Sequence, residues 1–282
     1  MDLEGLLIIM KTIILAAGYA TRLGELTKNF PKPLLQIGQS TILGRMLDDI
    51  DTIPDITEHI IVTNHKFAPI FQKWAAEQHY TKPLRVIDDG TETNETRLGA
   101  VRDLLLAIKE TGMSAGASPL NTEGNKKSSL LREDLGGSLL VTAADNLLDF
   151  SFQGFVDFAK AKCTSCIMCH HQPDIAKLQR TGVIEVDADW KVLNMEEKPE
   201  KPKSHWAVPP FYIYLKKDLP LILDCLNHGC GSDAPGNLAH YLAGLTTLHA
   251  YEMPGTRFDI GSLDTYEEAK RLFGRPTPPL PV

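Results

Sequence analysis

Short apolar runs alternate with helix-like segments along the first two thirds of the chain. Continuously apolar runs indicate buried strands at residues 12–17, 58–63, 84–88, 138–143 and 165–170. Amphipathic segments between these runs predict helices at 41–50, 66–78, 97–110 and 151–162. This alternation predicts a parallel sheet with helices on both faces. Right-handed crossovers would then place the carboxyl ends of the strands, and any ligand, along one edge.

The pattern changes beyond residue 180. Residues 182–199 ("GVIEVDADWKVLNMEEKP") predict a hairpin that turns at Asp187–Asp189, and residues 205–215 ("HWAVPPFYIYL") predict a single further strand. Helical patterns recur near residues 216–227, 235–244 and 262–273. We therefore expect one domain over residues 1–282, in which a smaller mixed lobe at about 176–275 completes a larger part at about 10–175.

Two segments predict little regular structure. Residues 112–129 ("GMSAGASPLNTEGNKKSS") are small and polar, so we expect a mobile loop. The tail at 276–282 is rich in proline, and we expect it to be flexible. Neither segment is assigned a functional role.

Composition narrows the classes of function. The chain has 282 residues, of which 43% are hydrophobic, and this is enough for a sizeable core. Its net charge of -7 argues against non-specific nucleic-acid binding, although a local cationic pocket could still bind anions. No apolar run approaches the roughly 20 residues that span a membrane. We therefore expect a cytoplasmic protein with neither nucleic-acid nor membrane partners.

The cysteines at 163–169 invite a metal or haem interpretation. Cys163, Cys166 and Cys169 are spaced C-x-x-C-x-x-C, and "CIMCH" matches a haem-attachment pattern. However, positions three apart on a strand face opposite sides, so Cys166 and Cys169 could not share an ion. We interpret these residues as core cysteines. Cys225 and Cys230 indicate no disulfide framework.

A loop of small residues and a cation follow the first predicted strand. Gly18, Ala20 and Thr21 would let backbone N–H groups approach phosphate oxygens, and the fork of Arg22 could bind two of those oxygens. The alternative is an ordinary tight turn with a surface arginine. Because the loop has neither a GxGxxG nor a GxxxxGK[ST] pattern, dinucleotide-oxidoreductase and P-loop functions are not indicated.

Lys32 and two aspartates supply the remaining candidate chemistry. Lys32 lies between two prolines that stiffen its backbone, and its charge could stabilise a phosphorus atom in its transition state. Asp145 follows a strand at the carboxyl end, where ligands collect. With Asp259 it could hold Mg²⁺, which needs only one or two carboxylates beside phosphate oxygens. Asp145 could instead cap a helix, and Asp259 could pair with Arg257.

Four ordered motifs resemble one family nearly end to end. "LAAGYATRL…PKPLL", "LLVTAADN", "NMEEKP" and "TRFDIGSLDTYEEA" are similar to signatures of the sugar-phosphate nucleotidylyltransferases, the NDP-sugar pyrophosphorylases such as glucose-1-phosphate nucleotidylyltransferases. The resemblance implies a Rossmann-like three-layer α/β sandwich with a mostly parallel central sheet. It also implies that a nucleoside triphosphate and a sugar 1-phosphate give an NDP-sugar and pyrophosphate, with Mg²⁺ as cofactor. A homo-oligomer would be compatible with it.

The resemblance also implies roles for individual residues. Catalysis would depend on Arg22, Lys32 and Asp145, and Asp145 and Asp259 would bind the metal. The sugar phosphate would contact Asn146, the backbone of Gly182, Glu197 and Lys198. The nucleotide would contact Leu15, Ala16, Ala17, Gly18, Thr21, Arg22, Lys32 and Gly99.

Departures from the family pattern leave alternatives open. Ala20 stands where glycine is common, Glu25 stands where proline is common, and residues 90–100 match the base-reading segment only loosely. The base and the sugar therefore stay open. The same chemistry could act on phosphocholine or a phosphonate, or the chain could be a non-catalytic nucleotide-binding subunit. The presence of every expected cation and carboxylate favours an enzyme.

Overall fold

The computed structural model describes residues 9–113 and 137–274. Most of the loop expected at 112–129, and all of the tail at 276–282, lie outside these described residues. Within the described ranges, none of the helices has the length and apolar character needed to span a membrane.

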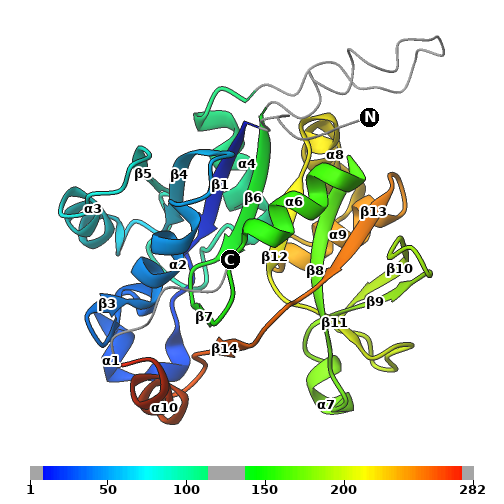
Figure 1. The fold of residues 1–282 in the computed structure, drawn as a ribbon. Helices are drawn as coiled ribbons and strands as arrows, with labels where there is room; N and C mark the ends of the chain where they lie inside the picture. The colour runs from blue at the N-terminus through cyan, green and yellow to red at the C-terminus, as the bar shows by residue number, and fades with distance from the viewer. Residues whose placement is uncertain (1–8, 114–136, 275–282) are drawn as a thin grey trace.

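A ten-stranded sheet forms the centre of the molecule (Figure 1). Its strand order is β10-β9-β11-β8-β12-β6-β1-β4-β5, and β13 pairs with β8. β14 pairs with β7, and β2 with β3, in two small separate ladders. The strands are β1 (Met10–Leu15), β2 (Gln36–Ile37), β3 (Ser40–Thr41), β4 (Ile56–Thr63), β5 (Leu84–Asp88), β6 (Ser138–Ala143), β7 (Asn146–Leu148), β8 (Ser165–His171), β9 (Gly182–Val186), β10 (Val192–Glu197), β11 (Trp206–Val208), β12 (Phe211–Tyr214), β13 (Leu248–Glu252) and β14 (Arg257–Asp259).

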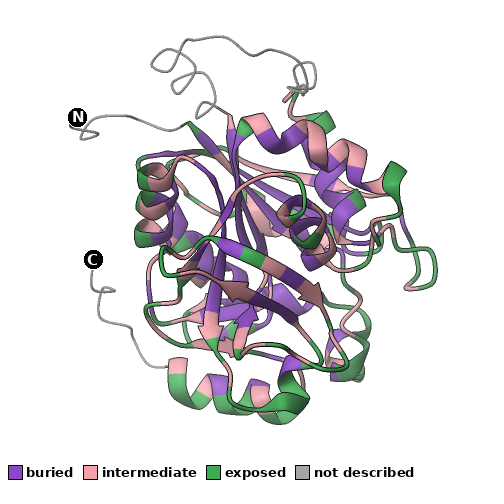
Figure 2. Cartoon of the chain, turned by 90° about the vertical axis from the view of Figure 1, so that its right-hand side faces the viewer, coloured by how far each residue is buried: buried purple, intermediate pink, exposed green. Residues whose placement is uncertain are grey.

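Helices cover both faces of this sheet, as Figure 1 and the burial colours of Figure 2 show. The apolar faces of α4, α8 and α9 pack on one side, and those of α2, α3 and α6 pack on the other. The α-helices are α1 (Glu25–Lys28), α2 (Ile42–Ile50), α3 (Ala68–Ala76), α4 (Ala100–Glu110), α6 (Gln153–Lys162), α7 (Ile175–Leu178), α8 (Leu219–Cys225), α9 (Pro235–Ala243) and α10 (Leu263–Phe273). Short 3-10 turns are η1 (Thr21–Leu23), η2 (Lys32–Leu34), η3 (Lys216–Asp218) and η4 (Leu226–His228).

Alternation along the strands explains the two-sided core. Ile13 of β1 packs in the cluster beneath α4, whereas Ile14 packs in the cluster beneath α2 and α3. Ile60 and Ile61 of β4 divide in the same way, because successive side chains of a strand point to opposite faces. β1 runs parallel to both β4 and β6. The expected α/β sandwich with a mostly parallel central sheet is therefore confirmed.

The expectation of one strand at 205–215 is wrong. Pro209 and Pro210 divide this run into β11 and β12, because proline has no N–H to donate to a strand ladder. β11 pairs with β8 and β9. β12 lies antiparallel between β6 and β8. The hairpin expected after residue 180 is present as β9 and β10, and it extends the same sheet.

The cysteines of β8 lie on opposite faces of the sheet, as the strand interpretation predicts. Cys166 packs beneath α6, and Cys169 packs in the cluster on the other face. No group of three or more His, Cys, Asp or Glu side chains able to hold a metal occurs within residues 9–113 and 137–274. The expectation that Cys225 and Cys230 form no disulfide framework is wrong. These two residues form a disulfide with each other.

Burial should protect two of the three free thiols from modification. Burial raises the pKa of Cys166 and Cys169 to about 12, whereas Cys163 is partly exposed. In native protein at pH 8, without reductant, we expect Cys163 alone to react rapidly with an aromatic disulfide reagent. Urea should release the other two thiols. Rapid reaction of Cys166 or Cys169 in the native state would contradict this packing.

Candidate active site

The carboxyl ends of β1 and β6 form the floor of the site. The N–H of Ala16 donates to the Val62 carbonyl at 2.8 Å, and the N–H of Ala144 donates to the Leu15 carbonyl at 3.1 Å. These bonds continue the sheet just past the strand ends. The segments that follow β1 and β6 therefore leave the sheet side by side.

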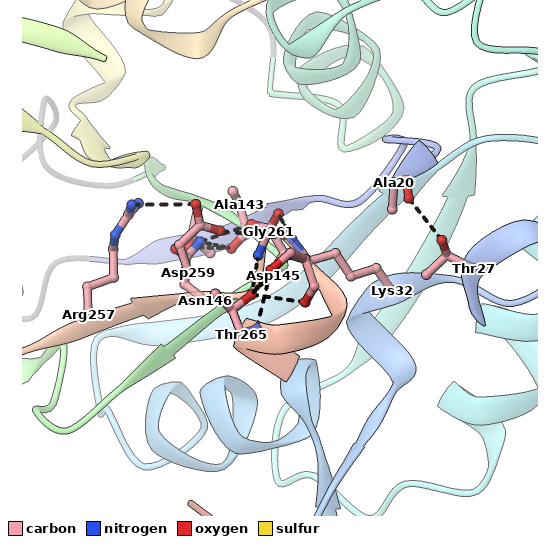
Figure 3. Close-up of polar contacts among 12 residues, drawn as sticks. Ala20, Thr27, Lys32, Ala143, Asp145, Asn146, Arg257, Asp259, Gly261 and Thr265 are labelled. Carbon is pink, nitrogen blue, oxygen red and sulfur yellow. Dashed lines mark hydrogen bonds and ion pairs between the residues drawn. The ribbon is translucent and has the colours of Figure 1, made fainter. Parts of the chain in front are cut away.

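The loop after β1 is open at the position where phosphate was expected. A Cβ built on Gly18 would meet no atom within 4 Å. Ala20 has a left-handed backbone with φ of 46°, a conformation that side chains with a Cβ adopt at a cost. The Thr27 hydroxyl donates to the Ala20 carbonyl at 2.9 Å and ties this turn to α1 (Figure 3).

Lys32 lies between the two predicted metal-binding aspartates. Its Nζ is 2.8 Å from Asp145 Oδ2 and 3.9 Å from Asp259 Oδ1 (Figure 3). The Lys32 side chain is 9% exposed, whereas those of Asp145 and Asp259 are 37% and 52% exposed. A buried ammonium thus balances two carboxylates that still reach solvent.

Pairing of two short strands brings the acidic residues together. Asp259 of β14 is the register partner of Asn146 in β7. The Asn146 amide donates to Asp145 Oδ1 at 3.1 Å, which fixes that carboxylate. Asp145 does not cap α6, whose N-cap residue is Phe152. The alternative pairing of Asp259 with Arg257 is present at 3.9 Å.

Two adjoining cavities extend along these residues. They have volumes of about 240 Å³ and 380 Å³, and we call them the first and second cavity. Both cavities are lined by Leu15, Gly18, Arg22, Ala143 and Asp145. The first also contains Ala16 and Lys32, and the second contains Ala17, Gly99, Asn146 and Asp259. Residues expected to bind a nucleotide, a metal and part of an acceptor therefore line one continuous recess.

Other expected site residues lie outside these linings. Thr21 is in η1 and is exposed. Gly182 and Glu197 are register partners in the β9–β10 hairpin, and Lys198 Nζ lies 3.8 Å from Glu197 Oε1. Burial raises the pKa of Glu197. These hairpin residues form a second group, next to the cavities but not lining them.

Close backbone packing connects the second group to the cavity. A Cβ on Gly182 would lie 3.2 Å from Glu197 Oε2, and one on Gly236 would lie 2.0 Å from the same oxygen. A side chain at position 236 would force the Glu197 carboxylate to move, and one at position 182 would crowd it. Gly236 begins α9 with Pro235, which lines the second cavity. The Glu197 carboxylate thus packs against Gly236, the neighbour of a residue that lines the second cavity.

Sequence reasoning missed several polar residues of the second cavity. Arg97, Asp103, Asp233 and Arg257 all line it. Arg97 Nε donates to Asp233 Oδ1 at 2.9 Å across a separation of 136 residues. In the sequence, Arg97 stands out only as part of the polar segment at 90–100. That segment does not indicate that its partner is Asp233.

Gly99 has a structural reason to be glycine. Its φ is 89°, and a Cβ there would lie 2.5 Å from the Ser232 carbonyl oxygen. The N–H groups of Ala100 and Val101 donate to the carbonyls of Asp233 and Ser232. Gly99 therefore accommodates the close approach of the segment before α9, while it also lines the second cavity.

Asp103 and Asp89 form a carboxyl pair beside the second cavity. Asp103 Oδ1 and Asp89 Oδ2 are buried, and neither accepts a hydrogen bond from the described residues. Burial, together with the charge of Asp89 and a hydrogen bond to it, raises the pKa of Asp103 to about 7. Asp103 therefore keeps its proton below neutral pH, and the two carboxyl groups do not both carry a negative charge there.

Replacing Asp103 by asparagine should stabilise the protein at pH 8. The pKa of Asp103 is about 7 in the folded state, against about 3.9 in an unfolded chain. The folded state therefore binds more protons between these values, and stability falls as pH rises from about 4 to 7. The variant lacks this penalty, so we expect a gain on the order of 2 kcal/mol at pH 8 that shrinks toward pH 4.

Urea unfolding at pH 8 and pH 5 would measure this difference. Asp189→Asn, at the exposed turn of the hairpin, is the matched control and should show neither the gain nor its pH dependence. If Asp103→Asn were equally destabilised at both pH values, the raised pKa of Asp103 would be contradicted.

A family model described as nucleotidyl transferase matches residues 11–274. A glucose-1-phosphate adenylyltransferase of Fervidobacterium nodosum is 25% identical over 276 residues, which cover 95% of this chain and 62% of that protein. A glucose-1-phosphate thymidylyltransferase of Mycolicibacterium smegmatis is 27% identical over 214 residues, covering 73% and 61%. The chain thus spans about three fifths of the length of the curated relatives it matches.

Solved structures share the fold. UDP-glucose pyrophosphorylase in complex with UDP-glucose has a TM-score of 0.72 at 18% identity, covering 93% of this chain and 97% of that one. The apo form of UDP-glucose pyrophosphorylase has a TM-score of 0.71 at the same identity and coverage. At this identity, the likeness supports the arrangement of sheet and helices only.

Proposed function

Because the chain belongs to the nucleotidyl transferase family, we propose that it joins a nucleoside triphosphate to a sugar 1-phosphate, giving an NDP-sugar and pyrophosphate. The observation that carries this proposal is the placement of Lys32, Asp145 and Asp259 together beside the two cavities. The relatives named as glucose-1-phosphate adenylyl- and thymidylyltransferases support the same reaction class.

The first cavity suits the triphosphate. Gly18 leaves the loop after β1 open, and Arg22 lines both cavities. The Arg22 guanidinium can donate two parallel hydrogen bonds to phosphate oxygens. Lys32 is buried at the same wall, so its charge acts where water screens it little. We assign the nucleotide to about residues 10–175 and the sugar phosphate largely to about 176–275.

The residues present fit Mg²⁺. Asp145 and Asp259 approach the same lysine nitrogen, and both carboxylates keep solvent-accessible surface. Oxygen donors of this kind, together with phosphate oxygens and water, are what the ion prefers. Bound there, the ion would neutralise phosphate charge. Addition of a chelator should therefore abolish turnover, and excess Mg²⁺ should restore it.

The reaction needs no protein nucleophile. A phosphate oxygen of the acceptor would form a bond to the α-phosphorus, and the bond from that phosphorus to the bridging oxygen of pyrophosphate would break. The acceptor phosphate is already an anion, so no proton need be removed. Lys32 would exchange its contact with Asp145 for the α-phosphate and stabilise the added charge. Catalysis would then depend on positioning and charge neutralisation.

The Glu197 group offers a place for the sugar. Its carboxylate is mostly buried against Gly182 and Gly236, and carboxylate oxygens accept hydrogen bonds from hydroxyl groups. No aromatic side chain is among the residues that line either cavity. A quaternary ammonium acceptor such as phosphocholine, which aromatic faces would favour, therefore gains no support from the described residues.

A panel of triphosphates and acceptors tests the proposal. Each of the common nucleoside triphosphates would be combined with sugar 1-phosphates, phosphocholine and a phosphonate, with Mg²⁺ present and pyrophosphate release as the readout. We expect release with at least one sugar 1-phosphate and much less with the other acceptors. Tight triphosphate binding without release for any acceptor would instead favour a non-catalytic subunit.

A further inference from the structure

We propose that Arg257 binds the phosphate group of the acceptor substrate. This inference rests on the proposed function and identifies a residue that the sequence motifs did not mark for this role. Arg257 lies on β14, two residues before Asp259, and it lines the second cavity. Its side chain is 23% exposed and points toward Asp259 (Figure 3).

The guanidinium of Arg257 keeps donors available for a ligand. Its contact to Asp259 Oδ2 is 3.9 Å, which is too long for a hydrogen bond. No other ion pair of Arg257 occurs among residues 9–113 and 137–274. A guanidinium carries five N–H donors in a planar fork that matches two phosphate oxygens. Arg257 therefore has both the charge and the geometry to bind an anion.

The other cations near the second cavity are less suited to the acceptor phosphate. Lys32 lines the first cavity and is already paired with Asp145. Arg97 is bound by Asp233 at 2.9 Å. Lys198, the cation that the motifs would assign to this phosphate, is outside the cavity linings, and its side chain is 52% exposed. Arg22 lines both cavities and is assigned to the triphosphate, so Arg257 is the cation of the second cavity that is left for a second anion.

Arg257 shares one buried neighbour, Tyr212, with Glu197. Burial raises the pKa of the Tyr212 hydroxyl, the charge of Glu197 raises it further, and the charge of Arg257 lowers it. Both charges therefore act on one buried hydroxyl. Because Arg257 is also next to Asp259, it lies between the carboxylates of the reaction centre and the expected sugar group. The phosphate of a sugar 1-phosphate that binds between these two groups would meet the Arg257 guanidinium.

His170, a buried neighbour of Arg257, adds no charge of its own at neutral pH. Burial, together with the charge of Arg257, lowers the pKa of His170 to about 4, so its ring is neutral at pH 7. Its Nδ1 is buried and has no hydrogen-bond partner among the described residues. Asp259, at 3.9 Å, is the carboxylate in contact with Arg257, and the guanidinium keeps donors for an incoming phosphate.

Kinetics of Arg257→Gln would test this assignment with the triphosphate and acceptor pair that gives the most pyrophosphate. We expect the acceptor KM to rise by about 10- to 100-fold, the usual range for a lost hydrogen bond to a charged group. The triphosphate KM should change by less than about threefold, because Arg22 and Lys32 bind that substrate. Arg257→Lys, which keeps the charge but loses the fork, should be intermediate.

Arg271→Gln, on the exposed face of α10, is the matched control and should leave both KM values unchanged. An unchanged acceptor KM in Arg257→Gln, or an equal rise in both KM values, would overturn the assignment. Calorimetry with inorganic phosphate gives a readout that does not depend on turnover. Phosphate binding should weaken at least about tenfold in Arg257→Gln and not in the control.

These two readouts separate the inference from the proposed function. Wild-type protein that releases no pyrophosphate with any pair would refute the function, whereas weaker phosphate binding in Arg257→Gln would still support the anion site. Normal turnover with unchanged phosphate binding in the variant would refute Arg257 alone.

Discussion

Replacing Lys32 by alanine is expected to lower kcat by about 10²- to 10³-fold, the range found when one preorganised donor to a transition-state oxyanion is removed. Lys32 is the buried cation of the site, and its Nζ contacts both Asp145 and Asp259. Its removal takes positive charge from the α-phosphate and also leaves the two carboxylates uncompensated beside a polyanion. Steady-state pyrophosphate release would measure the loss.

Lys28→Ala is the matched control for this variant. Lys28 is nearby in the chain, but its side chain is 62% exposed and pairs with the exposed Glu25. We expect turnover of this control within about twofold of wild type, because exposed ion pairs contribute little. Near-normal turnover in folded Lys32→Ala protein would remove Lys32 from the mechanism. Circular dichroism would establish that the variant is folded.

Asp145→Asn should lower kcat by a similar factor, about 10²- to 10³-fold, and should weaken the apparent affinity for Mg²⁺. The substitution keeps the size of the side chain and removes its charge. It therefore takes one carboxylate from the proposed metal site and the closest anionic partner from Lys32. Turnover as a function of Mg²⁺ concentration would separate the loss of metal binding from the loss of chemistry.

Asp189→Asn, in the exposed hairpin turn, controls for a simple change of net charge. It should keep both the kcat and the Mg²⁺ dependence of wild type. If Asp145→Asn had the same Mg²⁺ dependence as wild type, Asp145 would not be a metal ligand. If its kcat were also unchanged, Asp145 would have no part in the reaction.

Local sequence patterns predicted the central strands and the residues that follow them. β1, β6 and β8 appeared as short apolar runs because their side chains are buried on both faces of the sheet. Gly18 and Asp145 could be found because each follows such a strand within a short motif, and Lys32 because two prolines bracket it. That pattern places residues at the carboxyl edge, but the 2.8 Å contact of Lys32 with Asp145 spans 113 residues and needed the structure.

Features that depend on distant pairing escaped the sequence. β12 carries the same apolar pattern as a parallel strand, yet it lies antiparallel between β6 and β8. Arg257 lies in the motif that contains Asp259, but the motif gave it no role at the site, and it reaches the second cavity because β14 pairs with β7. The pKa of Asp103 is likewise raised by burial and by the charge of Asp89, which follows the end of β5. Burial and long-range contacts, rather than residue types, create these properties.

The stereochemistry at the α-phosphorus tests the central claim most directly. The claim is that cations and carboxylates at one recess hold two phosphate substrates so that one displaces pyrophosphate from the other in a single step. A triphosphate with one sulfur of defined configuration on its α-phosphorus would be converted to product, and the configuration of the product would be determined by ³¹P NMR. The account predicts inversion, and retention would contradict it, because retention requires a nucleotide bound covalently to the protein.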